Sequence, residues 1–168
     1  ITDDAGTVHA ASALGLGMQL QVDSAAVTNG TAAAHAVRFG SIALGPVASV
    51  DSSASSFVVL GQTVDVSTDT VFDSTLAAGL SALSVDTVVA VHGVYDSASG
   101  HIVASRIDSA SGATAYKLRG IVASLDTTAK TFLLRGGTVW YGGTVSFRNG
   151  VEADLAAARN VEVKGVLS

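Results

Sequence analysis

Short runs in which apolar and polar residues alternate follow one another along the chain, and Gly, Ser, Asp and Asn separate these runs. Alternation with a period of two predicts strands that bury one face. In the middle of the chain the predicted strands cover about residues 42–50, 57–60, 63–72, 87–95 and 101–107. Residues 74–83 place leucines three and four positions apart, which predicts one or two helical turns capped by Ser74. The elements therefore follow the order strand, strand, strand, short helix, strand, strand.

Part of this order occurs twice. Residues 47–64 align without a gap with residues 122–139, at a constant offset of 75 positions. A three-residue deletion further along shifts the offset to 72, so that Gly93 aligns with Gly165. We interpret the two copies as one supersecondary unit that the chain uses twice.

The copies divide the chain into three parts. Residues 1–40 are predicted to hold the last two strands of a unit, residues 41–112 a complete unit, and residues 113–168 a second unit that lacks its final strand. We expect residues 14–39 to supply the missing strand, within the chain or by strand exchange with a second copy, since exposed strand edges invite association. The predicted fold class is all-β, with tandem small β-barrels that resemble the oligonucleotide/oligosaccharide-binding (OB) barrel.

The turn of the last predicted hairpin of the complete unit, between residues 95 and 101, suggests how its two strands pair. If Tyr95 lies opposite His101, then Gly93 shares the core-facing side of the hairpin with Val103. An inward glycine marks a bend or the close approach of a neighbouring backbone. Because the glycine recurs as Gly165, we predict a structural role for it.

Composition and charge exclude several functions. The chain has 48% hydrophobic, 5% aromatic and 14% charged residues, a net charge of −5 and no cysteine. Thiol chemistry is therefore excluded, and basic residues that are spread without a cluster disfavour nucleic acid and anionic membranes. No apolar run is long enough for a transmembrane helix, and the chain starts at Ile1 without a signal-peptide pattern, so we expect a mature or trimmed chain.

A pattern of small, branched and glycine residues runs through the complete unit. Its residues are Gly45, Val47, Val50, Asp51, Phe57, Val59, Gly61, Val64, Val66, Thr70, Phe72, Leu83, Val89, Val91, Gly93, Gly100, Ile102, Ala104 and Ile107. This pattern resembles a bacterial family, domain-of-unknown-function family 5666. The resemblance implies a small OB-like barrel used in tandem, in exported or lipoprotein-type proteins of the periplasm or cell surface, and it supplies no catalytic residue. Pro46 departs from the pattern and suggests a strand start or edge at that point.

Four residues of the second copy form the best candidate ligand-binding patch. They are Trp140 and Tyr141, flanked by Arg135 and Arg148. OB surfaces bind bases on exposed aromatic rings beside cations, which is the chemistry that these side chains offer. The alternative is an aromatic pair on a strand that only stabilises a small barrel.

Catalytic residues, metal ligands and cofactors are not predicted. The chain contains neither a Gly-x-Ser-x-Gly elbow nor an HExxH motif, and its four histidines are interpreted as half-exposed strand or loop residues. We therefore expect a non-enzymatic binding or structural module of a bacterial exported or envelope protein, whose partners are a protein or glycan of the cell envelope. The alternative function is binding of an oligosaccharide or of single-stranded nucleic acid through an OB-like face, although the charge makes nucleic acid the weaker of the two.

Overall fold

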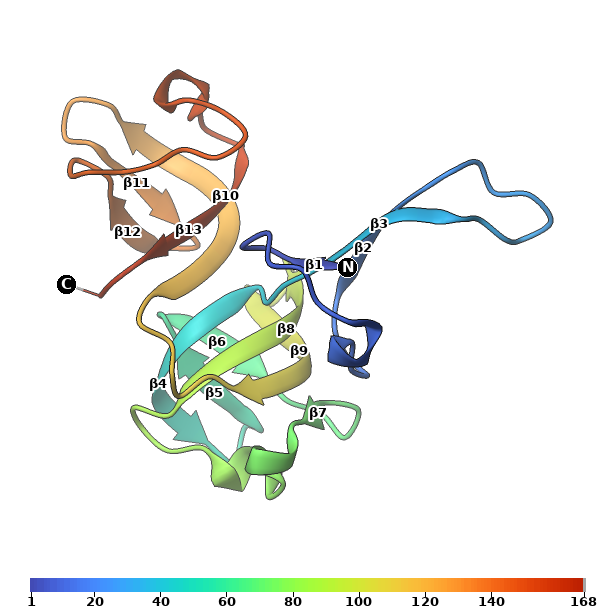
Figure 1. The fold of residues 1–168 in the computed structure, drawn as a ribbon. Helices are drawn as coiled ribbons and strands as arrows, with labels where there is room; N and C mark the ends of the chain where they lie inside the picture. Colours follow the sequence, from blue (N-terminus) through green and yellow to red (C-terminus); the bar gives the residue numbers. More distant parts are fainter. Residues whose placement is uncertain (168) are drawn as a thin grey trace.

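A computed structural model describes residues 1–167. Within these residues the chain is all-β apart from four short 3-10 turns, as the sequence predicts. Three parts are visible in Figure 1: a barrel in the middle of the chain, a sheet formed by the C-terminal residues, and an N-terminal arm that projects away from both. No helix in the described part of the chain reaches the length and hydropathy that crossing a membrane would need.

The barrel is closed by five strands. They are β4 (Ala43–Asp51), β5 (Ser56–Val59), β6 (Gln62–Asp65), β8 (Val88–Asp96) and β9 (His101–Ser109). Each strand pairs with two neighbours, in the order β4, β5, β6, β9, β8 and back to β4. All pairs are antiparallel except β6 with β9. A small closed barrel in which a short helical segment separates the third and fourth strands is the OB-type architecture, so the predicted fold class is confirmed.

Alternate side chains of every barrel strand fill the core. The fully buried members include Val47, Phe57, Val59, Val64, Val89, Val91, Ile102 and Ile107. Because β-branched residues pack well on a pleated surface, these short strands form an apolar core that buries the ring of Phe57, with Phe72 packed against it. The small apolar residues that dominate the composition therefore pack the core of a narrow barrel.

The segment between β6 and β8 differs in detail from its prediction. The third strand ends at Asp65, and a separate short strand, β7 (Val71–Phe72), pairs in parallel with β9. The helical turns are 3-10 turns, η2 (Ser74–Leu76) and η3 (Gly79–Ala82). The cap of η2 is Asp73 rather than Ser74, because the Asp73 carboxylate accepts hydrogen bonds from the backbone N–H groups of Thr75 and Leu76.

The β8–β9 hairpin has a different register from the predicted one. Tyr95 lies opposite Ile102 rather than His101, and a bulge between His92 and Gly93 shifts the pairing by one residue. A one-residue shift moves side chains to the other face, so Val103 is exposed and Ile102 is buried. The predicted close approach at Gly93 is confirmed, because a Cβ atom at this position would overlap the carbonyl oxygen of Val103.

The C-terminal sheet repeats part of the barrel's pairing. Its strands are β10 (Tyr116–Asp126), β11 (Thr131–Leu134), β12 (Gly137–Trp140) and β13 (Asn160–Gly165), and η4 (Glu152–Asp154) precedes the last of them. β10 pairs with β11 and β13, and β11 pairs with β12, as β4, β5, β6 and β8 do in the barrel. Within residues 1–167 no strand of this sheet takes the place of β9.

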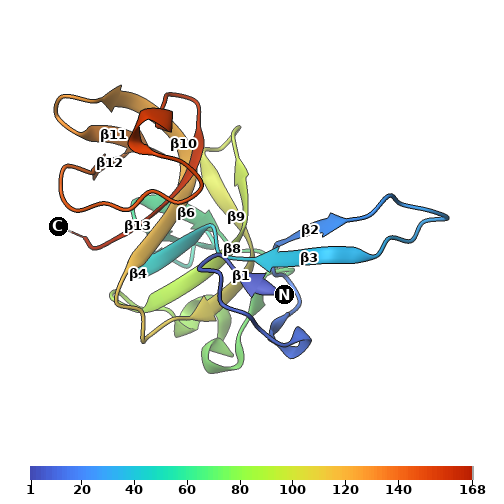
Figure 2. The same ribbon diagram turned by 45° about the horizontal axis from the view of Figure 1, so that its top comes forward.

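Strand β10 also joins the C-terminal sheet to the barrel. Its start pairs with the start of β4, Lys117 opposite Leu44 and Leu118 opposite Ala43, so one strand belongs to both parts (Figure 2). The pairing of β4 with β5 begins only at Val47. The expectation of a strand start or edge at Pro46 is wrong: Pro46 lies inside β4, where the missing N–H falls between the stretch paired with β10 and the stretch paired with β5.

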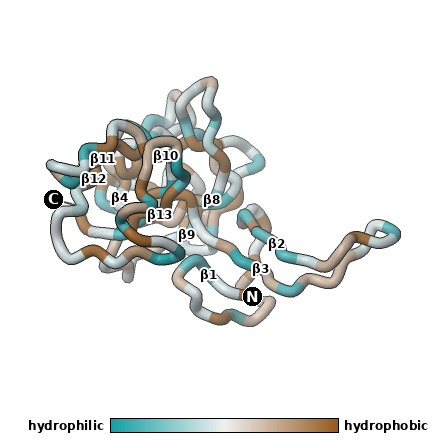
Figure 3. The backbone as a smooth tube through the Cα atoms, turned by 90° about the horizontal axis from the view of Figure 1, so that it is seen from above, coloured by the Kyte–Doolittle hydropathy of each residue, from teal (hydrophilic) through white to brown (hydrophobic). Residues whose placement is uncertain are grey.

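The N-terminal arm is a sheet of its own. It contains β1 (Thr2–Asp3), β2 (Leu20–Ser24) and β3 (Ala34–Phe39) in the order β1, β3, β2, and η1 (Ala11–Ala13) lies in the connection. The β2–β3 hairpin extends away from the rest of the molecule and carries apolar stretches along its length (Figure 3). The prediction that residues 14–39 complete the C-terminal unit within the chain is wrong, because β3 pairs with β2 and β1. Completion by a second copy stays a prediction.

The hairpin of the arm nevertheless resembles β8–β9 in its pairing. Val22 lies opposite Val37 as Val91 lies opposite Ile107, and a register shift follows in β2 as it does in β8. At its tip a two-residue Asn29–Gly30 turn has positive φ at both positions, which is the conformation that tight β-hairpins favour. The aligned sequences therefore adopt the same local structure, although only β8–β9 has a core to cover.

The two aligned glycines provide a test of this fold. Gly93→Ala should lower the free energy of unfolding by about 1–3 kcal/mol, because the added methyl group overlaps the Val103 carbonyl and β8 and β9 must move apart. Gly165→Ala is the matched control: no atom lies within 4 Å of the added Cβ, so stability should change by no more than about 0.5 kcal/mol. Urea unfolding of both variants measures the difference, and equal effects would contradict the close approach at Gly93.

Candidate functional site

The predicted aromatic pair lies where β12 ends, and its two rings have different surroundings. The Trp140 side chain is 65% exposed and lies against Gly142 and Gly143. Tyr141 is only 7% exposed and packs on Phe132, with the ring centroids 5.8 Å apart. Successive residues of an extended segment point to opposite sides, so one ring faces solvent and the other faces the core.

The two predicted arginines lie apart from this pair. Arg135, at the turn between β11 and β12, holds its guanidinium 3.9 Å from the ring centroid of Tyr95 in the barrel. The backbone carbonyl of the same residue accepts a hydrogen bond of 3.0 Å from Gln62 Nε2. Arg148 donates to the backbone carbonyl of Ala5 in the arm. Both arginines thus contact other parts of the chain, and the ligand-binding role of the four residues stays a prediction.

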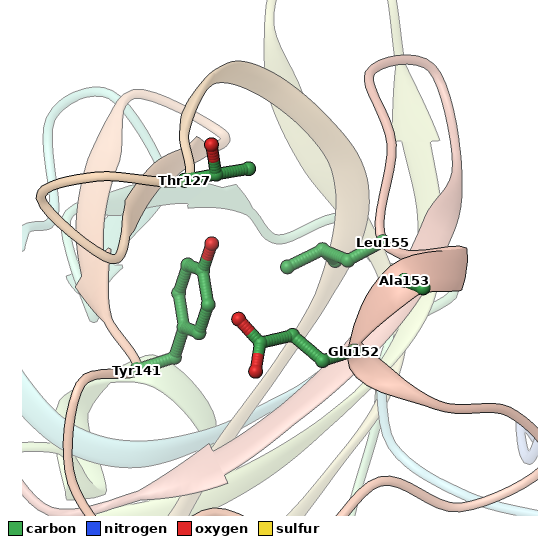
Figure 4. Close-up of a pocket in the computed structure, with 5 residues that line it drawn as sticks. All are labelled: Thr127, Tyr141, Glu152, Ala153 and Leu155. Carbon is green, nitrogen blue, oxygen red and sulfur yellow. The ribbon is translucent and has the colours of Figure 1, made fainter.

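A cavity of about 380 Å³ opens beside Tyr141. Its lining consists of Thr127, Tyr141, Glu152, Ala153 and Leu155. Figure 4 shows the Tyr141 ring and the Glu152 carboxylate facing the same space, with Leu155 and Thr127 on its other sides. We call this space the Tyr141 cavity; it combines an aromatic ring, an aliphatic wall, two hydroxyl groups and one carboxylate.

Lys130 partly balances the charge of the cavity. Its ammonium group donates a hydrogen bond to Glu152 and lies 5.7 Å from the Tyr141 ring centroid. The hydrogen bond to Glu152 raises the pKa of Lys130 above its usual value. Since both side chains of this pair are about half exposed, the pair contributes little to stability.

The aligned positions of the barrel explain why only the C-terminal part has this cavity. Where the barrel carries Val66 and Leu80, packed against its core, the C-terminal part carries Tyr141 and Glu152. The three-residue deletion also shortens the connection that bears η2 in the barrel, where Leu76 is buried. The aligned copies contain the signal for this cavity, an acidic residue in the place of a leucine that packs on the core, and no motif reveals it.

A second cleft lies where the three parts of the chain meet. It is open to solvent, has a volume of about 480 Å³ and is lined by Asp3, Asp4, Phe39, Gly40, Ser41, Leu44, His92, Gly112, Ala113, Thr114, Ala115, Lys117 and Lys164. Lys117 is buried in it and donates a hydrogen bond to Asp4. Lys164 also binds Asp4, at 3.3 Å. Because Asp4 belongs to the arm and both lysines to the C-terminal sheet, these ion pairs hold the two parts together.

The pKa values of the buried pair reflect this environment. Burial by itself raises the pKa of Asp4, but hydrogen bonding and charge from Lys117 and then Lys164 outweigh it, so the pKa lies below its usual value. Burial lowers the pKa of Lys117, and the contact with Asp4 opposes this effect. The pair is therefore a structural charge contact that needs both members.

His92 reaches the same cleft from β8. The expectation that the histidines are half-exposed is wrong for this residue, whose side chain is buried and places Nε2 3.4 Å from the Asp108 carboxylate. Arg106 donates to the same carboxylate at 2.8 Å. The Nδ1 atom of His92 is buried without a hydrogen-bond partner among residues 1–167. In that part of the chain no three acidic or histidine side chains converge to hold a metal ion.

Fold and cavities together define a β-barrel protein of OB type with a small second sheet. The family model described as Domain of unknown function (DUF5666) matches residues 45–108, which run from β4 to the end of β9. The barrel is therefore similar to the DUF5666 family, in agreement with the resemblance that its sequence pattern carries. No curated protein and no solved structure matches the chain.

The buried ion pair yields a prediction about stability. Asp4→Asn should lower the free energy of unfolding by about 3–5 kcal/mol, because it leaves the Lys117 charge buried without its partner. The native pKa of Asp4 lies below its unfolded value, so the carboxylate stabilises the fold above the unfolded pKa, and this contribution disappears as the pH falls through the native pKa. The difference between wild type and variant should therefore shrink below about pH 4.

Thermal and urea unfolding between pH 7 and pH 3 measure both effects. Glu152→Gln is the matched control, since it removes one member of a half-exposed ion pair and should cost less than about 1 kcal/mol. The double variant Asp4→Asn, Lys117→Met should recover most of the loss, because no charge is then left unpaired. A variant Asp4→Asn as stable as wild type at pH 7 would show that the pair does not hold the arm.

Proposed function

We propose that the protein is a non-catalytic binding module, built from tandem OB-type units, and that its ligand is an oligosaccharide that enters the Tyr141 cavity. The observation that carries the proposal is the difference between two aligned parts of one chain. The barrel fills the position with leucine and valine, whereas the C-terminal part opens it and lines it with hydroxyl and carboxylate groups. Matching strand pairings support the description of the two parts as related units.

The chemistry of the cavity suits a sugar. A pyranose ring presents C–H groups on its faces, which pack on aromatic and aliphatic side chains such as Tyr141 and Leu155, and hydroxyl groups at its edge. The Glu152 carboxylate accepts hydrogen bonds from such hydroxyls, and charge-assisted hydrogen bonds of this kind are the strong ones. The exposed ring of Trp140, the residue before Tyr141, offers a further stacking surface for a sugar residue.

Single-stranded nucleic acid is a poorer fit to the same surface. Affinity for a phosphate backbone needs cations that are free to replace counterions. Here Arg135 lies over Tyr95, Arg148 binds a carbonyl of the arm, and Lys130 binds Glu152, whose own charge repels phosphate. The proposal therefore places a neutral, hydroxyl-rich ligand ahead of an anionic one.

An exported or cell-surface location is part of this proposal. It is supported by the resemblance of the sequence pattern to exported bacterial proteins, and a glycan of the envelope is the ligand that such a location would offer. A signal peptide or lipid-anchor motif in the full gene product would test the location directly.

The single tryptophan provides a probe for ligand binding, since Trp140 is exposed and directly precedes Tyr141 in the chain. Oligosaccharides of cell-envelope composition should change its fluorescence with saturation, and oligonucleotides of similar length should not. Glu152→Gln and Tyr141→Phe should each weaken sugar binding about tenfold, because the first removes the negative charge of the acceptor and the second removes a hydroxyl group, and about 1.4 kcal/mol is a factor of ten. Tyr116→Phe in β10 is a matched control and should bind as wild type does.

Two outcomes would overturn the proposal. A response to oligonucleotides and not to oligosaccharides would favour the nucleic-acid alternative. Fluorescence that neither class changes, together with the absence of any heat of binding in calorimetry, would leave the chain a structural module without this ligand.

A further inference from the structure

The cleft where the three parts of the chain meet, which we call the junction cleft, brings buried polar side chains together. Ser41, His92 and Lys117 are each only 5% exposed, and all three line this cleft. Phe39 adds an apolar wall. An open cleft with an apolar wall and a few convergent polar groups is the usual form of a site for a small molecule.

Three cationic side chains of the C-terminal sheet surround one carboxylate at this cleft. Asp4 of the arm accepts a hydrogen bond from Lys117, and it lies 3.3 Å from Lys164 Nζ and 3.6 Å from the guanidinium of Arg119. The Asp4 side chain is 14% exposed, and a Cβ atom at Gly40 would overlap its Oδ2 atom. The carboxylate therefore fits a tight site, and we call the three cations around it the carboxylate seat.

The turn that carries Asp4 does not itself need a carboxylate at this position. Asp3, the residue before it, accepts hydrogen bonds from the backbone N–H groups of Ala5 and Thr7 and so closes the turn. Three other turns are closed by an aspartate in the same way, and the residue that follows each aspartate is exposed and carries a hydroxyl group: Ser52, Ser97 and Thr127. Asp4 is therefore explained by the carboxylate seat and not by the turn.

His92 adds an unsatisfied acceptor to the junction cleft. Its Nε2 atom faces the Asp108 carboxylate at 3.4 Å, and an ionised carboxylate only accepts hydrogen bonds, so we assign the ring proton to Nε2. The Nδ1 atom of the neutral ring is then an acceptor, and it is buried without a hydrogen-bond partner among residues 1–167. A buried polar atom without a partner costs free energy, which a ligand hydroxyl group would recover.

We propose that the junction cleft binds a uronic acid, which is a sugar that carries one carboxylate, and that Asp4 occupies the place of this carboxylate until the sugar enters. The ligand carboxylate takes the carboxylate seat, so that the buried ammonium group of Lys117 keeps an anionic partner throughout. A ring hydroxyl donates to Nδ1 of His92. Asp4 can withdraw because the residues that follow it, 5–8, are exposed.

The size of the cleft favours a sugar over a simple acid. Its volume of about 480 Å³ leaves room for a sugar ring, whereas an acid such as acetate would fill only a small part of it. The Phe39 wall offers an apolar surface to the C–H groups of the ring. A ligand must also outcompete an aspartate of the same chain, which requires contacts beyond the carboxylate itself.

This site is separate from the Tyr141 cavity, with which it shares no lining residue. The two sites also favour different sugars, because the carboxylate in the Tyr141 cavity repels an acidic sugar and the ammonium groups of the junction cleft attract one. The proposal therefore does not rest on the ligand proposed for the Tyr141 cavity, and either can fail without the other.

NMR titrations of the intact chain with glucuronate, glucose and acetate test the ligand class. Glucuronate should shift the backbone amide signals of Ser41 and Gly112–Ala115 with saturation, because these residues line the junction cleft. Glucose lacks the carboxylate and acetate lacks the ring, so each should bind there at least tenfold more weakly. The amide of Ala153 in the Tyr141 cavity is an internal reference and should not follow the same curve.

Lys164→Met tests the carboxylate seat from the side of the protein. The lysine side chain is 43% exposed, so the chain should stay folded, and the loss of one cation should weaken glucuronate binding about tenfold. Arg159→Met is the matched control, because it removes one positive charge at an exposed position before β13 that does not line the cleft. This variant should bind glucuronate as wild type does.

Asp4→Ala tests the competition between the arm and the ligand. Because the carboxylate seat is then vacant, glucuronate should bind at least tenfold more tightly than to wild type. It should also raise the melting temperature of this variant more than that of wild type, since the bound carboxylate restores a partner to Lys117.

Three results would overturn the proposal. One is the absence of saturable shifts at the junction cleft with glucuronate. Another is equal binding of glucuronate and either glucose or acetate, which would remove the need for the carboxylate or for the ring. The third is equal glucuronate binding by Lys164→Met and wild type, a comparison that stands even if Asp4→Ala does not fold.

Discussion

The pairing of β10 with β4 is the contact on which the arrangement of the whole chain depends. It fixes the backbone of Lys117 against Leu44 of the barrel, and the lysine side chain is then buried where the three parts meet. A buried ammonium group needs an opposite charge, and Asp4 of the arm provides it. One sheet contact thus places a charge, and the charge in turn positions the N-terminal residues, which have few apolar contacts of their own.

Similar sequences give one closed and one open structure here, and the difference arises from a few residues. In the barrel a fifth strand and three leucines of the β7–β8 segment complete a dry core. The C-terminal sheet has a glutamate in place of one leucine, and residues 1–167 hold no fifth strand for it. The open part is where ligand chemistry becomes accessible, because a small barrel that is completely packed leaves no room for a ligand.

Most charged side chains near the candidate sites already have partners inside the chain. Arg106 and His92 share Asp108, Arg119 binds Glu162, and Arg135 lies over Tyr95. In a chain with few charged residues, this use of charges to connect the three parts leaves little free cationic surface. Because most cationic side chains are already paired in this way, the Tyr141 cavity offers a ligand mainly hydroxyl groups and one carboxylate.

Alternation, turn residues and the aligned copies were sufficient by themselves to determine the all-β class, the barrel strands and the special role of Gly93, because these depend on local periodicity and backbone sterics. The register of β8–β9 could not be predicted, since one bulge shifts every partner beyond it, nor could the cap at Asp73. Tertiary structure alone decided that Tyr141 lines a cavity, that Arg135 belongs to an interface, and that Lys117 is buried. Those outcomes depend on which distant segments pack together, and single-sequence patterns carry no record of that packing.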